Sequence, residues 1–221
     1  MSSFEEVLRA RRSVRGFLPE PVDPVTLREI FELARWAPSN CNIQPWEVHV
    51  VSGTSLQQLK EKMLAAARSG ESVELDIPMD TRYSGVWRER QIGAAKALYG
   101  AMGIARDDHA GRAQAFLRNL EAFGAPHAAF VFLPEPFGLR EAADLGGYTQ
   151  TLMLVMASRG VASCAQGALS LYPDLVREHL GLPAGPQLIM GIAFGMEDRD
   201  HPANAARTDR ADLSTLVCFH D

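Results

Sequence analysis

Apolar side chains recur every three or four residues in several stretches of this sequence, which is the spacing of one face of an α-helix. The clearest stretch follows Asp23 and Pro24, because Asp is a favoured N-cap and Pro is favoured at the first helical position. The pattern predicts helices at about 4–11, 24–36, 54–70, 91–101, 111–123, 139–159 and 173–181. We expect Gly160 to end the helix at 139–159 in a left-handed cap.

Other stretches show the patterns of β-strands. Trp46, Val48 and Val50 alternate with polar residues, which predicts a strand with one polar face. The segments 128–133 and 187–194 are apolar on both faces and predict buried strands. Shorter strands are expected at about 161–164 and 216–219. Together these elements predict an α+β fold with a sheet of four to five strands flanked by helices.

Residues 70–125 are the least regular third of the chain. We expect a loop over 76–83 and, with the two helices that follow, a helical excursion within one domain that spans 1–221. Aromatic residues are concentrated here: Tyr83, Trp87, Tyr99, Phe116 and Phe123. They belong either to a small core within the excursion or to a lid over a ligand site.

The composition narrows the class of protein. Hydrophobic residues make up 47% of the 221 residues, which suits a globular core. Lys and Arg number 22 against 27 Asp and Glu, and this net charge of −5 argues against a nucleic-acid-binding surface. No apolar run approaches the length of a membrane span and no signal-peptide pattern is present, so we expect a cytoplasmic protein without membrane contact.

The three cysteines and six histidines are scattered, so neither a disulfide framework nor a metal site is expected. Cys41 and Cys164 lie inside segments that could carry chemistry. No histidine stands near either of them in the sequence to act as a base. We therefore expect both thiols to be small apolar filler.

Two arginine-rich segments stand near the two ends of this acidic chain. The run Arg11-Arg12-Ser13-Val14-Arg15 offers guanidinium groups that match phosphate oxygens, or it neutralises the end of the helix before it. Arg207 and Arg210 lie in a segment that could complete the same phosphate clamp, or they form an exposed charged loop.

Two further segments could contact a ligand. Residues 37–46 place one hydroxyl and three carboxamides between two prolines, which suits the edge of a planar heterocycle or an ordinary loop at a helix end. The small residues around Gln166 and Gly167 follow a strand and would let backbone N–H groups approach a ligand closely.

These four segments, in this order, resemble the nitroreductase family of FMN-dependent oxidoreductases. The resemblance spans nearly the whole chain, and residues 83–126 are most similar to the branch of nitrobenzoate and nitrobenzene reductases. It implies a central, mostly antiparallel sheet and an intertwined homodimer with FMN at the subunit interface.

The resemblance also implies roles for individual residues. One group would hold the FMN phosphate and ribityl chain: Arg11, Arg12, Ser13, Arg15, Arg207 and Arg210. A second group would come from the other subunit and lie on or near the flavin: Pro38, Ser39, Asn40 and Asn42. Gln166 and Gly167 would direct backbone N–H groups at the reactive flavin nitrogen and the ring edge.

The implied reaction is ping-pong: NADH or NADPH reduces the flavin and leaves, and the acceptor is then reduced in the same cleft. Acceptors would be flat and electron-poor, such as nitroaromatics or quinones, and Tyr83, Phe116 and Phe123 are the candidates to stack on them. No catalytic side chain and no metal are needed. The alternatives are other flavin chemistry on this scaffold (enone reduction, dehalogenation or flavin fragmentation) and an FMN-binding redox sensor without turnover.

Overall fold

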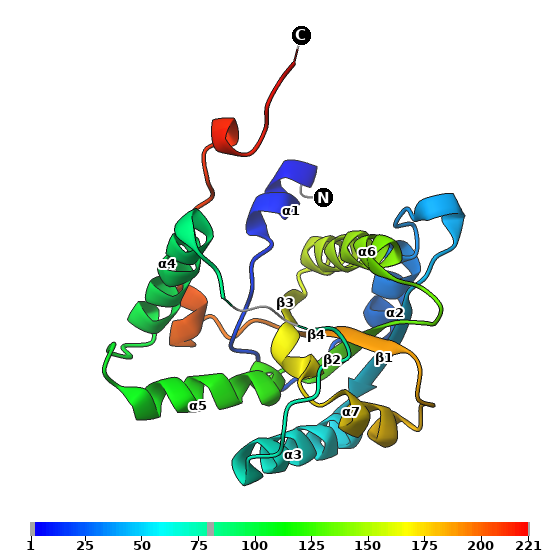
Figure 1. Ribbon diagram of the computed structural model, residues 1–221, viewed down its shortest axis with the longest axis horizontal. Helices are drawn as coiled ribbons and strands as arrows, with labels where there is room; N and C mark the ends of the chain where they lie inside the picture. The colour runs from blue at the N-terminus through cyan, green and yellow to red at the C-terminus, as the bar shows by residue number, and fades with distance from the viewer. Residues whose placement is uncertain (1–2, 79–81, 221) are drawn as a thin grey trace.

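Four antiparallel strands form the sheet at the centre of the structure, a computed structural model that describes residues 3–78 and 82–220 (Figure 1). The strands are β1 (Glu47–Ser52), β2 (His127–Leu133), β3 (Ala162–Gln166) and β4 (Gln187–Gly195). Their order across the sheet is β1-β2-β4-β3, and each neighbouring pair is antiparallel. The predicted α+β fold is therefore confirmed, with four strands in the described part of the chain.

Each of the predicted helices is present. The α-helices are α1 (Phe4–Ala10), α2 (Pro24–Ala34), α3 (Gly53–Ser69), α4 (Gly85–Ala101), α5 (His109–Leu120), α6 (Leu139–Ser158) and α7 (Pro173–Leu180). Short 3-10 turns include η1 (Asn40–Asn42), η3 (Gly167–Ser170), η4 (Pro202–Ala205) and η5 (Leu213–Thr215). In the described ranges, no helix is both long enough and apolar enough to cross a membrane.

Local capping chemistry explains most of the helix boundaries. The Asp23 side chain accepts a hydrogen bond from the Thr26 N–H at 2.9 Å, as expected for the N-cap of α2. Gly160 follows α6 with a φ of 75°, as predicted. The start of α4 was not predicted, because this helix buries none of its side chains and so carries no apolar periodicity over its first turns. α5 ends before 123 because Ala122 and Phe123 adopt left-handed φ angles.

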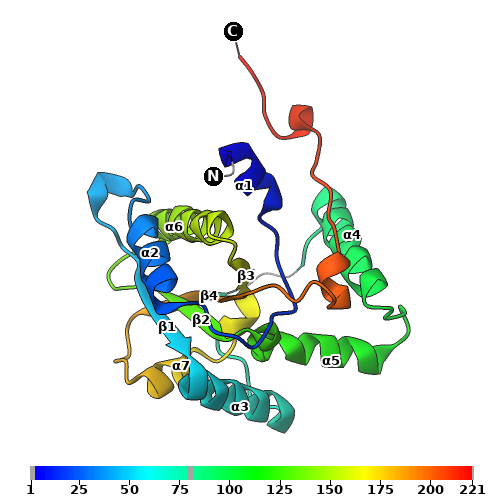
Figure 2. The same ribbon diagram turned by 180° about the vertical axis from the view of Figure 1, so that it is seen from behind.

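The strand expected at 216–219 is wrong. After η5 the chain continues without strand pairing, and the apolar side chains of Leu216, Val217 and Phe219 are exposed. Figures 1 and 2 show this red segment extending away from the rest of the chain, so no neighbouring strand can pair with it. Of the loop expected at 76–83, residues 79–81 lie outside the described residues.

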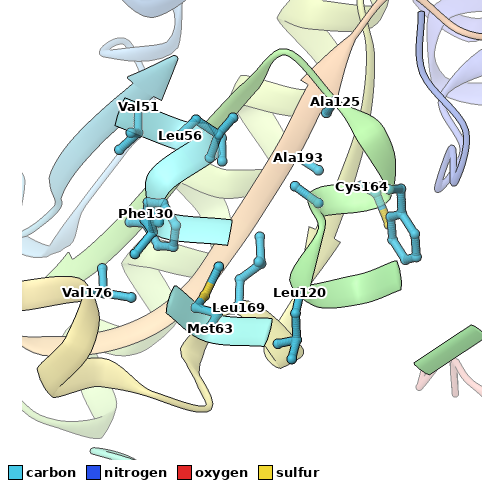
Figure 3. Packing of buried hydrophobic residues seen from close by; sticks show 14 of the residues in the cluster. Val51, Leu56, Met63, Leu120, Ala125, Phe130, Cys164, Leu169, Val176 and Ala193 are labelled. Carbon is cyan, nitrogen blue, oxygen red and sulfur yellow. The ribbon is translucent and has the colours of Figure 1, made fainter. Parts of the chain in front are cut away.

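The sheet separates two hydrophobic clusters. Every residue of β2 is buried, and its side chains alternate between the two faces. Phe130 and Phe132 join the cluster under α3 and α7, whereas Val131 and Leu133 join the cluster under α2 and α6. Figure 3 shows side chains of the first cluster gathered around Phe130. β2 therefore anchors the fold from both faces.

The edge strand β1 departs from its predicted alternation. Val50 is exposed and Val51 is buried, although the pattern placed Val50 on the apolar face. Trp46 and Val48 pack against one cluster while Val51 belongs to the other. The strand therefore contacts apolar side chains on both faces, so no face is wholly polar.

His127 is a buried polar residue that joins the sheet to the segment before α2. Its Nε2 accepts a hydrogen bond from the Val22 N–H at 2.9 Å, and its Nδ1 lies 2.5 Å from Oγ of Ser52. Because Nε2 accepts, the neutral ring carries its proton on Nδ1 and donates to Ser52. Burial lowers the pKa of His127 below its ordinary value of 6.5.

This arrangement predicts a loss of stability in acid. In the unfolded chain His127 takes up a proton near pH 6.5, whereas in the folded chain it does so only at lower pH. Its contribution is therefore complete above pH 6.5 and is lost as the pH falls through the folded pKa. Urea unfolding between pH 7.5 and 5 should show a smaller pH dependence for His127→Gln than for the wild type. The variant His220→Gln, at an exposed position, serves as the control. If the free energy of unfolding depended equally on pH in the wild type, His127→Gln and His220→Gln, the role of His127 would be contradicted.

Candidate functional site

A cavity of about 680 Å³ brings the two ends of the chain together beside α4. The arginines and the serine predicted to clamp a phosphate all line it: Arg11, Arg12, Ser13, Arg15, Arg207 and Arg210. The rest of its wall comes from α1, from α4 (including Leu98 and Tyr99), and from Ala206 and Thr208 beside the C-terminal arginines. Residues nearly 200 positions apart in the sequence thus surround one space.

Backbone pairing fixes the N-terminal arginine run in this place. Ser13 pairs with Ser163 in a parallel bridge beside β3, the strand at the edge of the sheet. Further along, the Leu18 N–H donates to the Met196 carbonyl at 2.9 Å, just beyond β4. These contacts hold residues 13–18 as an extended segment along the end of the sheet. They therefore fix the backbone positions from which the arginine side chains of 11–15 project.

The charge of the cavity is only partly compensated. Arg12 forms an ion pair with Glu197. Arg15 and Arg210 donate mainly to backbone carbonyls, which do not neutralise a guanidinium group. The guanidinium group of Arg11 has no hydrogen-bond or ion-pair partner among residues 3–78 and 82–220. Several uncompensated guanidinium groups around one cavity, in a chain of net charge −5, have the chemistry to attract an anion.

The turn after β3 presents backbone groups further along the same edge of the sheet. Gln166 is only 4% exposed, and its Nε2 donates to the Asn119 carbonyl at 3.1 Å. Its Oε1 is buried without a hydrogen-bond partner in the described structure. Gly167 is exposed, so the backbone of this turn can be reached by a ligand. Gln166 lies three residues after Ser163 along β3, or about 10 Å away at the usual rise of a strand.

The structure does not bring the loop at 37–46 to this cavity. The residues named from it, Pro38, Ser39, Asn40 and Asn42, lie on the opposite side of the molecule from α4, where Figure 1 shows η1 in light blue. The loop is backbone-strained, since Cys41, Asn42 and Gln44 adopt φ angles of 49°, 57° and 50°.

Hydrogen bonds stabilise this strained loop. The Ser39 hydroxyl accepts from the Gln44 N–H at 2.9 Å, and the Asp144 carboxylate accepts from the Asn40 N–H at 3.0 Å. The loop therefore has a defined shape, which is set by hydrogen bonds within the loop and to Asp144 of α6.

A smaller cavity of about 190 Å³ adjoins the first and shares Arg15, Leu98 and Tyr99 with it. Phe116 and Phe123 line it, although Phe123 is mostly buried in the core. Tyr83 lines neither cavity and is exposed. The interpretation that the aromatic residues of 70–125 form a separate small core is wrong for three of them, because these side chains are exposed: Tyr83, Trp87 and Phe116.

The cysteines differ in their surroundings. Cys164 is buried, and burial raises the pKa of its thiol despite the nearby charges of Arg15 and Arg11. Cys41 is exposed, so the expectation that it fills the core is wrong. In the part of the chain that the structure describes, no three His, Cys, Asp or Glu side chains gather to hold a metal ion.

Comparison with known proteins identifies the family. The sequence profile of the Nitroreductase family matches residues 8–196, which is most of the chain. The chain belongs to the nitroreductase family. "Nitroreductase NfnB" of Mycolicibacterium smegmatis is 43% identical over 97% of this chain and 92% of its own length. "4-Nitrobenzoate reductase" of Pseudomonas putida is 33% identical over 94% of this chain and 91% of its own length.

Solved structures of nitroreductases confirm the nitroreductase fold. The FMN-dependent nitroreductase NfnB from Mycobacterium smegmatis, in complex with NADPH, superposes with a TM-score of 0.94 at 42% identity, covering 98% of this chain and 97% of the other. The FMN- and NADPH-dependent nitroreductase NfnB from Sphigopyxis sp. strain HMH gives a TM-score of 0.96 at 36% identity, with both chains covered completely.

The thiols are not expected to take part in the chemistry of this nitroreductase. Cys164 is buried with a raised thiol pKa, and within the described ranges the hydrogen bond of the Cys41 thiol goes to the Asn40 carboxamide, which is not a base. The double variant Cys41→Ala, Cys164→Ala should therefore keep turnover within about tenfold, equivalent to about 1.4 kcal/mol. Steady-state rates with a nitroaromatic acceptor measure this. A much larger loss, with the fold intact by circular dichroism, would indicate a reactive thiol.

Proposed function

We propose that this nitroreductase is an FMN-dependent enzyme that takes electrons from NADPH and reduces nitroaromatic compounds by a ping-pong mechanism. The observation that carries the proposal is the cationic cavity, where arginines from both ends of an acidic chain surround one space. The NfnB relatives, described as FMN- and NADPH-dependent, support the cofactor and the electron donor.

The residues present fit FMN. A phosphate dianion suits the cavity, because charge-assisted contacts from guanidinium groups contribute about 1.5–3 kcal/mol each. In this proposal the phosphate is held by Arg11, Arg12, Ser13, Arg15 and Arg210, with Arg207 beside them. The flavin ring extends towards the Gln166-Gly167 turn, whose backbone N–H groups meet its edge. The orphaned Oε1 of Gln166 lies at that end of the site.

Bound FMN supplies the electron transfer between NADPH and the acceptor. The chain's own residues bind and orient it. The arginine-lined wall favours negative charge in the cavity, which lowers the free energy of an electron-rich ring. Phe116 and Phe123 line the adjoining cavity, where a flat acceptor can stack. In this proposal residues 70–125 form a lid, and Tyr83 contacts the acceptor from it.

We also propose that the active form is a homodimer, with the loop Pro38–Asn42 of each subunit completing the site of the other. The loop lies far from its own chain's cavity yet has a strained, defined shape. Large apolar side chains are exposed on α1 and on the tail: Phe4, Leu8, Leu213, Leu216 and Phe219. Apolar side chains gathered in this way favour association with a second copy.

An absorption spectrum tests the function directly. The purified protein should be yellow, its band near 450 nm should bleach on mixing with NADPH, and 4-nitrobenzoate should restore it. A protein that takes up FMN but is not reduced by NADPH would be a flavin carrier without turnover. A protein that takes up no FMN would contradict the proposal altogether.

Removing one guanidinium group should release the cofactor. Arg12→Ala and Arg15→Ala are each expected to weaken FMN binding by about tenfold to a hundredfold, the loss of one charge-assisted contact. Arg68→Ala is the matched control, because Arg68 is exposed near the end of α3 and lines neither cavity. Full retention of FMN in Arg12→Ala and Arg15→Ala, with unchanged circular dichroism, would show that the phosphate lies elsewhere.

Shortening the tail should weaken the dimer. A chain that ends at Ala211 lacks the exposed apolar residues of the tail, so it should dissociate at protein concentrations where the full chain remains dimeric. Sedimentation velocity over a concentration series measures this. A full-length chain that is monomeric throughout the series would overturn the dimer, and a shortened chain that is equally dimeric would place the interface away from the tail.

A further inference from the structure

The cavity depends on a residue that does not line it. Asn204 lies in η4, is only 3% exposed, and is absent from the cavity wall. Its Oδ1 accepts from the Arg15 N–H at 2.7 Å, and its Nδ2 donates to the Gly16 carbonyl at 2.8 Å. Its Nδ2 also donates to the Asp198 carbonyl at 2.7 Å. One carboxamide thus satisfies three backbone groups, from Arg15, Gly16 and Asp198, in segments more than 180 residues apart.

The backbone of Asn204 orients two guanidinium groups. Its carbonyl accepts from Nη1 of Arg12 at 3.1 Å and from Nη1 of Arg207 at 2.8 Å. These arginines come from the two ends of the chain and point into the same space. The position of the Asn204 carbonyl therefore fixes where both charges lie relative to each other.

The contact between η4 and residues 15–16 is tightly packed. A Cβ placed on Gly16 would lie 2.2 Å from Cγ of His201, so the glycine backbone packs directly against that ring. Arg118 of α5 contacts His201 and also donates from Nη2 to the Arg15 carbonyl at 3.2 Å. Because the junction is close-packed, a shift of η4 moves the arginine run with it.

We propose that Asn204 is a positioning residue for the anion site, setting the separation of Arg12, Arg15 and Arg207 so that they converge on one phosphate. The inference rests on the proposed function for the identity of the ligand. The role of Asn204 has a consequence that the proposed function does not have: Asn204 controls binding of the phosphate and leaves binding of the ring unaffected. A buried carboxamide is suited to this task, since its donor and acceptor faces are both used and it adds no charge.

Comparing FMN with riboflavin isolates that consequence, because riboflavin has the same ring and no phosphate. In equilibrium dialysis of the full-length protein, Asn204→Ala is expected to raise the FMN dissociation constant at least tenfold. The riboflavin dissociation constant should stay within about twofold. The preference for FMN over riboflavin should therefore fall about tenfold, which a general loss of folded protein cannot produce.

Two further variants control for stability. Leu59→Ala removes a fully buried side chain of α3 that does not line the cavity, so it destabilises the fold without changing the preference for FMN. Asn204→Ser keeps a small polar side chain, and it carries the test if Asn204→Ala does not fold. Its preference for FMN should fall in the same direction.

The outcomes separate the two proposals. A wild type that binds FMN no better than riboflavin would contradict the phosphate site itself, and with it the proposed function. A wild type that prefers FMN, with Asn204→Ala and Asn204→Ser keeping that preference, would overturn only the role of Asn204. Equal losses of both flavins in the Asn204 variants would also overturn it, because they would show a purely structural residue.

Discussion

Guanidinium groups repel one another, so a cluster of them persists only where the backbone holds them in place. Here the holding interaction is the pairing of residues 13–18 with the ends of β3 and β4, through the bridge from Ser13 to Ser163 and the bond from Leu18 to Met196. The segment carries the arginine run to the sheet edge, and the chain leaving β4 carries the second group to the same place. The arginine-lined cavity is therefore a product of topology: it forms only when both ends of the chain meet.

The sheet gives this junction a rigid support. β2 and β4 lie in the interior of the sheet with apolar clusters on both faces, while β3 is at the edge and remains open to the added segment. The turn at the end of β3 therefore follows the same strand that pairs with Ser13, without a separate loop to carry it. Sites supported by strands in this way keep their geometry better than sites on free loops. The strained loop at 37–46 is the exception, because it lies away from the cavity of its own chain; we propose that it belongs to the site of a second subunit.

Much of the fold was predictable from local chemistry, and the site was predictable only in part. Asp23, Pro24 and Gly160 mark helix ends by mechanisms that act within a few residues, and the apolar run at 128–133 could only be a buried strand. The tail at 216–219 has the composition of a strand, but pairing needs a partner that its own chain does not provide. The arginine segments were recognisable by residue type and by resemblance to the family. Asn204 gave no signal, because its role arises from bonds to residues nearly 190 positions away.

The difference between residue type and residue position also decides which measurement tests the proposed phosphate site best. Residue types identify candidates, whereas convergence on one ligand is a matter of position, which only a structure of the complex records. A crystal structure of the protein with FMN is the most direct measurement. In that crystal structure we expect the phosphate within hydrogen-bond distance of Arg11, Ser13 and Arg210, with the ring reaching the Gln166-Gly167 turn. A phosphate located away from both arginine segments would contradict the proposed phosphate site.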